Sequence, residues 1–153
     1  MTNLLYGVGY NSKGVHKTKI NGTITIAYNK WRRMIERCYS AKCQTRNPTY
    51  IGCTVDKEWH DFQNFAEWFY CQDYSDLNYQ LDKDLLDHES KVYSPKTCCL
   101  VPIELNALLT SNDANRGELP QGASLHRGTG KYRSTISINN KHMYLGLYDT
   151  PEE

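Results

Sequence analysis

The sequence predicts an α+β fold for its 153 residues, arranged as one ordinary domain or two small ones, and three local patterns carry this prediction. An Asn-Gly pair at 21–22, between two β-prone runs, indicates a two-residue hairpin. An amphipathic helix is indicated by the spacing of four apolar residues that would lie on one of its faces: Trp31, Met34, Ile35 and Cys38. Short alternating segments near the C-terminus indicate an antiparallel sheet.

The middle of the chain predicts a second helix, two strands and a third helix. The second helix carries an aromatic stripe that we expect in the core, formed by Trp59, Phe62, Phe65, Ala66, Phe69 and Tyr70. Residues 79–86 and 91–102 are the strand candidates, the latter with a bend at Pro95. Pro102 suits the first turn of a helix over 102–111.

The C-terminal part predicts three short antiparallel strands over 123–127, 131–138 and 141–149. Alternation along the middle strand makes one face of this sheet polar and basic, and the other face needs a cover. Residues 150–153 have the pattern of a helix start, so either a helix follows in a longer chain or the N-terminal part covers the sheet.

The domain boundaries follow from a segment without apolar periodicity. We place an N-terminal core at 1–115, a linker at 116–120 and a C-terminal module at 121–153.

Charge is distributed unevenly along the chain, although the total is only +1. Residues 1–50 carry nine Lys or Arg against one Glu, residues 51–120 carry five basic and thirteen acidic side chains, and residues 121–148 carry four basic and none acidic. Basic segments are typical of phosphate contact, and an acidic middle suits a hard cation. The alternative is that these charges mix in the folded protein and cancel. Three arginines of the first helix lie off its apolar face and are candidate phosphate contacts: Arg32, Arg33 and Arg37.

The sequence also indicates where in the cell the protein is located. No apolar run approaches the length of about 18 residues that a membrane span needs, and the N-terminus lacks the pattern of a signal peptide. We therefore expect a cytoplasmic protein with mostly reduced cysteines and no membrane partner. The six cysteines include no Cys-x₂-Cys pair, so we do not expect zinc.

An ordered set of motifs over 28–109 resembles the His-Asn-His (HNH) ββα-metal finger of nucleases, and more closely a group of phage-encoded HNH-type proteins. The matching residues are Trp31, Met34, Arg37-Cys38-Tyr39, Tyr50-Ile51-Gly52, Val55, Trp59, Phe62, Phe65, Leu81-Asp82-Lys83 and Tyr93-Ser94-Pro95-Lys96-Thr97-Cys98. The resemblance implies a degenerate ββα finger with flanking helices. It also implies a homing-endonuclease-like activity that nicks or cuts duplex DNA with Mg²⁺ or Mn²⁺.

The resemblance assigns roles to few residues. Asp82, Asp84 and Asn106 are the implied metal ligands. Lys83 stands where the family has its general-base histidine, and a protonated lysine cannot accept a proton from water near neutral pH. His88 is the alternative base, and Lys83 could instead bind the scissile phosphate.

Residues 121–153 resemble the ethylene-response-factor type of DNA-binding domain. The match lies in Gly122-Ala123, Lys131-Tyr132-Arg133-Ser134, Leu145-Gly146-Leu147-Tyr148 and Thr150-Pro151-Glu152-Glu153. It implies that the sheet enters the major groove of duplex DNA. The implied DNA contacts are Arg127, Lys131, Arg133 and Lys141.

Two functions are therefore expected. The first is a phage-type, metal-dependent DNA endonuclease acting in the host cytoplasm. The second is a catalytically inactive DNA-binding protein on the same scaffold, or an inhibitor of a host defence or CRISPR system, with a host defence protein as its partner. Lys83 and Thr97, which replace the family's histidine and asparagine, favour the second.

Overall fold

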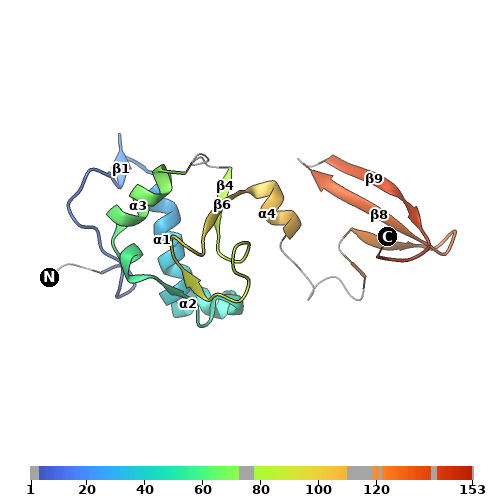
Figure 1. Cartoon of the computed structure of the whole chain (residues 1–153), viewed down its shortest axis with the longest axis horizontal. Helices are drawn as coiled ribbons and strands as arrows, with labels where there is room; N and C mark the ends of the chain where they lie inside the picture. Colours follow the sequence, from blue (N-terminus) through green and yellow to red (C-terminus); the bar gives the residue numbers. More distant parts are fainter. Residues whose placement is uncertain (1–3, 73–77, 110–118, 121, 139–140, 153) are drawn as a thin grey trace. The chain divides into compact units, whose positions relative to one another are not determined.

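The fold is α+β, as the sequence predicts, with short helices and small sheets (Figure 1). The computed structural model describes residues 4–72, 78–109, 119–120, 122–138 and 141–152. In these ranges no helix is long and apolar enough to cross a membrane.

The chain divides into two compact units, Met1–Pro102 and Ile103–Glu153, which we call unit 1 and unit 2. The third predicted helix is thereby grouped with the C-terminal sheet, whereas the sequence places it in the N-terminal core. The predicted linker at 116–120 lies mostly outside the described residues.

The predicted N-terminal hairpin is confirmed as β1 (Lys19–Ile20) and β2 (Thr23–Ile24), which pair antiparallel. Asn21 and Gly22 have φ angles of 50° and 80°. Positive φ at both central residues is what a two-residue type I′ turn requires, and Asn-Gly meets that requirement at low cost.

The first predicted helix is confirmed as α1 (Ile26–Tyr39). Thr25 caps its N-terminus, since the side-chain oxygen accepts the backbone N–H of Tyr28 at 3.4 Å. All four residues of the predicted apolar face are buried, together with Ala27. The short helix α2 (Ala41–Arg46) follows directly.

The second predicted helix begins later than its aromatic stripe indicates. Trp59 lies in the 3₁₀ turn η2 (Lys57–His60), and α3 spans Phe62–Tyr70. The cause is Asp61, whose Oδ1 accepts the backbone N–H of Gln63 at 3.1 Å and so caps a new helix. A second 3₁₀ turn, η1 (Pro48–Tyr50), lies earlier in the chain.

The core of unit 1 is aromatic and lies where α1 and α3 pack together. Its largest fully buried side chains are Trp31, Trp59, Phe62, Phe65, Phe69, Met34 and Ile35. Trp59 meets Phe65 edge-on, with 5.0 Å between ring centroids. The indole N–H of Trp31 donates to the backbone oxygen of Trp59 at 2.7 Å, so one of the buried indoles is satisfied inside the core.

Two pairs of short strands complete unit 1. β3 (Thr54–Val55) pairs parallel with β5 (Val92–Tyr93), and β4 (Tyr79–Asp82) pairs antiparallel with β6 (Cys99–Pro102). The prediction of one bent strand over 91–102 is therefore wrong, because its two ends pair with different partners.

The break between β5 and β6 is a turn held by Ser94 and Thr97. The backbone oxygen of Ser94 accepts the N–H groups of Thr97 and Cys98 at 3.3 and 3.0 Å. The Thr97 hydroxyl donates to the backbone oxygen of Val92 at 2.6 Å and accepts the N–H of Ser94 at 3.1 Å. These side-chain bonds compete with strand pairing and stop β5 after two residues.

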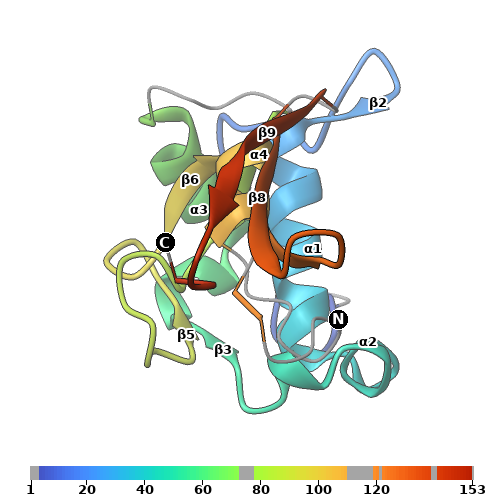
Figure 2. The same cartoon turned by 90° about the vertical axis from the view of Figure 1, so that its right-hand side faces the viewer.

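Unit 2 contains α4 (Ile103–Leu109) and three antiparallel strands in the order β7-β8-β9. The strands are β7 (Ala123–His126), β8 (Lys131–Ile138) and β9 (Lys141–Tyr148), which confirms the three predicted segments. In both cartoon views β8 and β9 run side by side (Figures 1 and 2).

Three details of the C-terminal third of the chain differ from the prediction or stay untested. Pro102 ends β6 and does not enter the helix. At the C-terminus, Pro151 and Glu152 form a turn. The turn predicted at Asn139-Asn140 lies outside the described residues.

Candidate functional site

The register of the β7-β8-β9 sheet decides which side chains share a face, because directly paired residues point to the same side. Lys131 on β8 pairs with His126 on β7, and Arg133 pairs with both Ser124 and Leu147. We call the face that contains Arg133 the polar face. Its members are Ser124, His126, Lys131, Arg133, Thr135, Ser137, His142, Tyr144 and Leu147.

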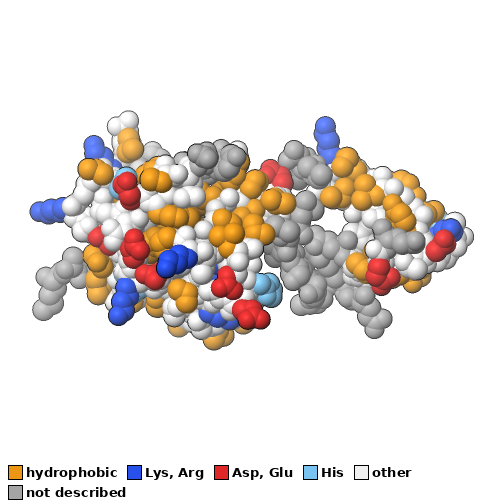
Figure 3. Space-filling model, in the orientation of Figure 1, with side chains coloured by type: hydrophobic (Ala, Val, Ile, Leu, Met, Phe, Trp, Pro, Cys, Tyr) orange, Lys and Arg blue, Asp and Glu red, His pale blue; other side chains and the backbone are white. Residues whose placement is uncertain are grey.

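The opposite side of the sheet is the apolar face. Its described members are Ala123, Leu125, Tyr132, Ser134, Ile136, Met143, Gly146 and Tyr148. Leu125 and Met143 are 53% and 46% exposed, and Figure 3 shows hydrophobic side chains gathered on the visible surface of this sheet. The alternation that the sequence predicts for β8 is therefore present in three dimensions.

A β-bulge on β9 changes the alternation within that strand. Ser134 pairs with Gly146 and Thr135 with Tyr144, so Leu145 is the extra residue. Gly146 has φ of 153°, a conformation that favours glycine. In the part of β9 that precedes the bulge, the even-numbered residues His142 and Tyr144 lie on the polar face.

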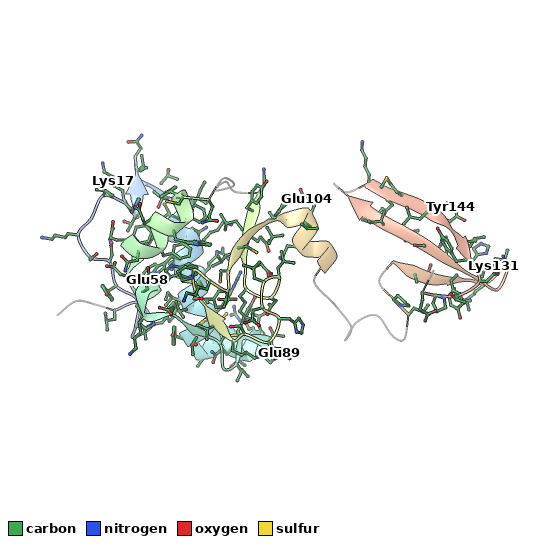
Figure 4. The ribbon with its side chains drawn as sticks, viewed as in Figure 1. Lys17, Glu58, Glu89, Glu104, Lys131 and Tyr144 are labelled. Atoms are coloured by element: carbon green, nitrogen blue, oxygen red, sulfur yellow. The ribbon has the colours of Figure 1, made fainter. Side chains whose placement is uncertain are left out.

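The basic side chains of this sheet differ in their surroundings. Arg127 and Arg133 are exposed. Lys131, which Figure 4 labels, is also exposed and forms an ion pair of 2.8 Å with Asp149. Lys141 pairs with residue 138, so the register assigns it to the apolar face. The predicted DNA contacts are thus divided between a turn and both faces.

Two histidines of the polar face were missed by sequence reasoning. His126 Nδ1 lies 2.9 Å from the Thr129 hydroxyl, and His142 Nδ1 is hydrogen-bonded to the Ser137 hydroxyl. The position of His142 on the polar face follows from the register of β9. The bulge shifts that register, so alternation in the sequence alone does not predict it.

The predicted metal and catalytic residues of unit 1 lie at the end of β4. Asp82 is half-buried, and its Oδ1 accepts the backbone N–H groups of Asp84 and Leu85, both at 2.8 Å. Lys83 is only 7% exposed; its ammonium group donates to the Asp84 carboxylate and, at 3.0 Å, to the backbone oxygen of Ser90. Asp84 and His88 are exposed.

Lys83 is held in its protonated form. Burial works to lower the pKa of this ammonium group, but the hydrogen bond and charge of Asp84 outweigh burial, so the pKa lies above its ordinary value. A group with a raised pKa is a cation at neutral pH and cannot accept a proton from water. The environment of Lys83 therefore suits an anchor for the loop after β4 better than a general base.

The predicted ligand Asn106 lies on α4, in unit 2, so the set of Asp82, Asp84 and Asn106 is divided between the two units and stays a prediction. In the parts of the chain that the structure describes, no three His, Cys, Asp or Glu side chains gather as a metal site. Oxygen donors are nevertheless the chemistry that Mg²⁺ and Mn²⁺ prefer, and the remaining oxygen of Asp82 is of that type.

The three arginines of α1 occupy different environments. Arg33 is exposed, whereas Arg32 is half-buried, and its Nε is buried without a hydrogen-bond partner in the described residues. The guanidinium of Arg37 lies 5.4 Å from the centroid of the Tyr50 ring and hydrogen-bonds to Tyr93. Burial works to lower the pKa of Arg37 and the two tyrosines raise it, with a net increase.

The arrangement around Arg37 indicates a structural role. The guanidinium of Arg37 is positioned by Tyr50, on which it stacks, and by the buried Tyr93, to which it is hydrogen-bonded. Of the three predicted phosphate contacts on α1, Arg33 is therefore the one whose exposure fits a surface contact.

Comparisons of the chain with known proteins add no relative. No family model, no curated protein and no solved structure matches it.

Proposed function

We propose that this chain binds duplex DNA through the polar face of the β7-β8-β9 sheet. The observation that carries the proposal is the strand register, which gathers Lys131, Arg133, His126 and His142 on one face. The three strands contain no Asp or Glu, so the face has no fixed negative charge of its own. A polyanion would meet mainly cations and neutral side chains there, with the Asp149 carboxylate at the edge of the face beside Lys131.

The shape of the element supports DNA as the partner. The major groove is about 12 Å wide and admits a two-stranded β-ribbon, which β8 and β9 provide over eight residues each. Arg133, near the middle of the sheet, has the fork of donors that pairs with the O6 and N7 atoms of guanine. Hydroxyls of Thr135 and Ser137 suit phosphate oxygens.

Arg133→Gln tests this proposal in the full chain. A preferred duplex would first be enriched from a random library, and fluorescence anisotropy would compare it with mismatched duplexes. We expect the variant to lose about 1–3 kcal/mol of discrimination, because a bidentate base contact is worth that much. Lys96→Gln, which removes one exposed charge from unit 1, is the matched control.

The proposal fails if the unmodified chain has no affinity for duplex DNA. It also fails if affinity does not fall as salt rises from about 50 to about 200 mM, because phosphate contacts release counterions.

Metal-dependent nicking of DNA is a second candidate function. The observation in its favour is the order of elements: β4, with Asp82 at its end, pairs with β6, and α4 follows directly. Asp82 and Asp84 would contribute oxygen ligands to Mg²⁺ or Mn²⁺, and the ion would stabilise negative charge on the leaving oxygen. The buried, protonated Lys83 favours the non-cleaving alternative.

A plasmid-nicking assay with Mg²⁺ or Mn²⁺ separates the two candidates. Nicking that disappears in Asp82→Asn supports the enzyme. Binding without nicking in either metal contradicts it and leaves the sheet as a DNA-binding surface.

A further inference from the structure

A basic hollow lies on unit 1, apart from every residue discussed so far as a DNA contact. Residues of the loop 11–19 and the side chain of Gln63 line a volume of about 410 Å³. Three of the lining residues are lysines, Lys13, Lys17 and Lys19, and none is acidic. Figure 4 shows Lys17 on the loop that leads to β1. The hollow therefore concentrates positive charge on one side of the unit.

The loop around the hollow is held in place by α3. The amide nitrogen of Gln63 donates to Asn11 Oδ1 at 2.7 Å and to the backbone oxygen of His16 at 2.9 Å, while its Oε1 accepts the N–H of His16 at 3.0 Å. A Cβ at Gly14 would overlap the Gln63 side chain, so glycine permits this close approach. One side chain thus fixes both ends of 11–16.

A second anchor adds to the first. The N–H of Ser12 donates to Asp61 Oδ1 at 3.0 Å, and Tyr10 exchanges backbone hydrogen bonds of 2.9 Å with His60 and Phe62. Because Phe62 is in the core, the loop is fixed to a buried part of unit 1. A preorganised loop loses less conformational entropy when it binds a ligand.

The acidic groups near this loop are already engaged. Glu67 lies 2.8 Å from Nε2 of His16, and Asp61 accepts two backbone N–H groups. In the described part of the chain Lys13, Lys17 and Lys19 form no ion pair. Three exposed ammonium groups thus share one concave surface and have no ion-pair partner among the described residues.

We infer that this hollow is a second binding site for the phosphates of duplex DNA, formed by Lys13, Lys17 and Lys19 on the loop that Gln63 holds. The inference rests on the proposed DNA binding and adds a contact in unit 1 to the sheet in unit 2. Lysines act on phosphates as point charges and read no bases, so this site adds affinity without sequence preference.

The salt dependence of DNA binding tests the inference in the full chain. The triple variant Lys13→Gln/Lys17→Gln/Lys19→Gln is compared with the control Lys42→Gln/Lys57→Gln/Lys96→Gln, which removes three exposed charges from other parts of unit 1. The slope of log affinity against log salt is negative, and each lost phosphate contact reduces its magnitude by about 0.9. We therefore expect the magnitude to fall by roughly 2–3 for the first variant and by less than about 1 for the control.

The outcomes separate this inference from the proposed function. If the unmodified chain does not bind duplex DNA, both fail. If it binds, and the loop variant keeps its slope or falls no further than the control, the hollow is no phosphate site while the sheet proposal stands. Discrimination between preferred and mismatched duplexes should stay unchanged in the loop variant, and its loss would also overturn the inference.

Gln63→Ala tests the contribution of the loop anchor, because it keeps all three lysines. We expect weaker DNA binding at unchanged salt slope, since the charges remain but must be ordered on binding. Affinity equal to that of the unmodified chain would contradict the role of Gln63.

Discussion

Unit 1 and the C-terminal sheet differ most in what they bury. Every buried apolar side chain in the described chain lies between residues 27 and 101, whereas the described residues of β7, β8 and β9 are half-buried or exposed. Unit 1 is organised around an aromatic core, and the sheet is organised by backbone pairing and one bulge. A three-stranded sheet gains independent stability from a covered hydrophobic face.

The difference teaches where to look for stability and where to look for contact. Side chains that hold unit 1 together face inward and pack against one another, while side chains of the sheet remain open to a partner. Substitutions should therefore separate into those that change unfolding of unit 1 and those that change binding.

The largest effect is expected in the core. Phe65→Ala removes a ring that is 0% exposed and contacts Trp59, Trp68 and Phe69. We expect a loss of about 3–5 kcal/mol in the free energy of unfolding, measured by urea denaturation. Val15→Ala, at a side chain 83% exposed, is the control. A loss below about 1 kcal/mol for Phe65→Ala would contradict the assignment of the core.

Thiol labelling examines the same burial by chemistry. Burial raises the pKa of Cys38 and of Cys98 to about 12, because the thiolate is disfavoured away from water. The thiolate fraction at pH 8 is then about 1000-fold below that of an ordinary cysteine, and it rises about tenfold per pH unit until pH nears the pKa. Mass spectrometry after iodoacetamide treatment should find the exposed Cys71 modified first. Equal rates would show that unit 1 opens readily.

Arg33 and Arg37 give a paired test on one helix. Arg37→Met loses the stacking on Tyr50 and the hydrogen bond to Tyr93. We expect the free energy of unfolding to fall by about 1–3 kcal/mol, because the Tyr93 hydroxyl then stays buried without this hydrogen bond. Arg33→Met should leave unfolding within about 0.5 kcal/mol. Urea denaturation measures both. The reverse order would show that Arg37 is not structural.

The smallest effect is expected at the edge of the polar face. Asp149→Asn removes a carboxylate that forms an ion pair with Lys131. An exposed ion pair of this kind contributes about 0–1 kcal/mol to stability. Duplex affinity should rise by a factor of a few at low salt, measured by anisotropy, because the variant removes one negative charge beside Lys131. Asp87→Asn, exposed in unit 1, should change affinity less. Weaker binding by Asp149→Asn would mean that the carboxylate positions Lys131 for its contact.

Local pattern was enough to predict the elements whose cause is local. The Asn21-Gly22 hairpin, the apolar face of α1 and the three C-terminal strands depend on turn chemistry and periodicity, and all are present. The bent strand over 91–102 failed because its ends choose partners far away in sequence, β3 and β4. Periodicity carries no information about such pairing.

The candidate sites show the same limit. Sequence could name Arg133 and Lys131 as basic, but only the register assigns His142 to their face and Lys141 to the other. Arg37 looked like a surface cation because it lies off the apolar stripe; its tyrosine partners come from η1 and β5, which no helical pattern reveals. The hollow around 11–19 depends on Gln63, roughly fifty residues away.

The extra residue Leu145 divides β9 into two parts with opposite alternation between the faces of the sheet. Up to Tyr144, even-numbered residues lie on the polar face; from Gly146 onward, odd-numbered residues do. Deleting Leu145 would make Tyr144 and Gly146 neighbours, and they already pair with the neighbouring residues Thr135 and Ser134, so the ladder would become regular and the other side chains of β9 would keep their faces. The bulge is therefore the point at which β9 can lose one residue without changing which side chains meet a partner, whereas an added residue elsewhere in the strand would turn part of β9 to the opposite face.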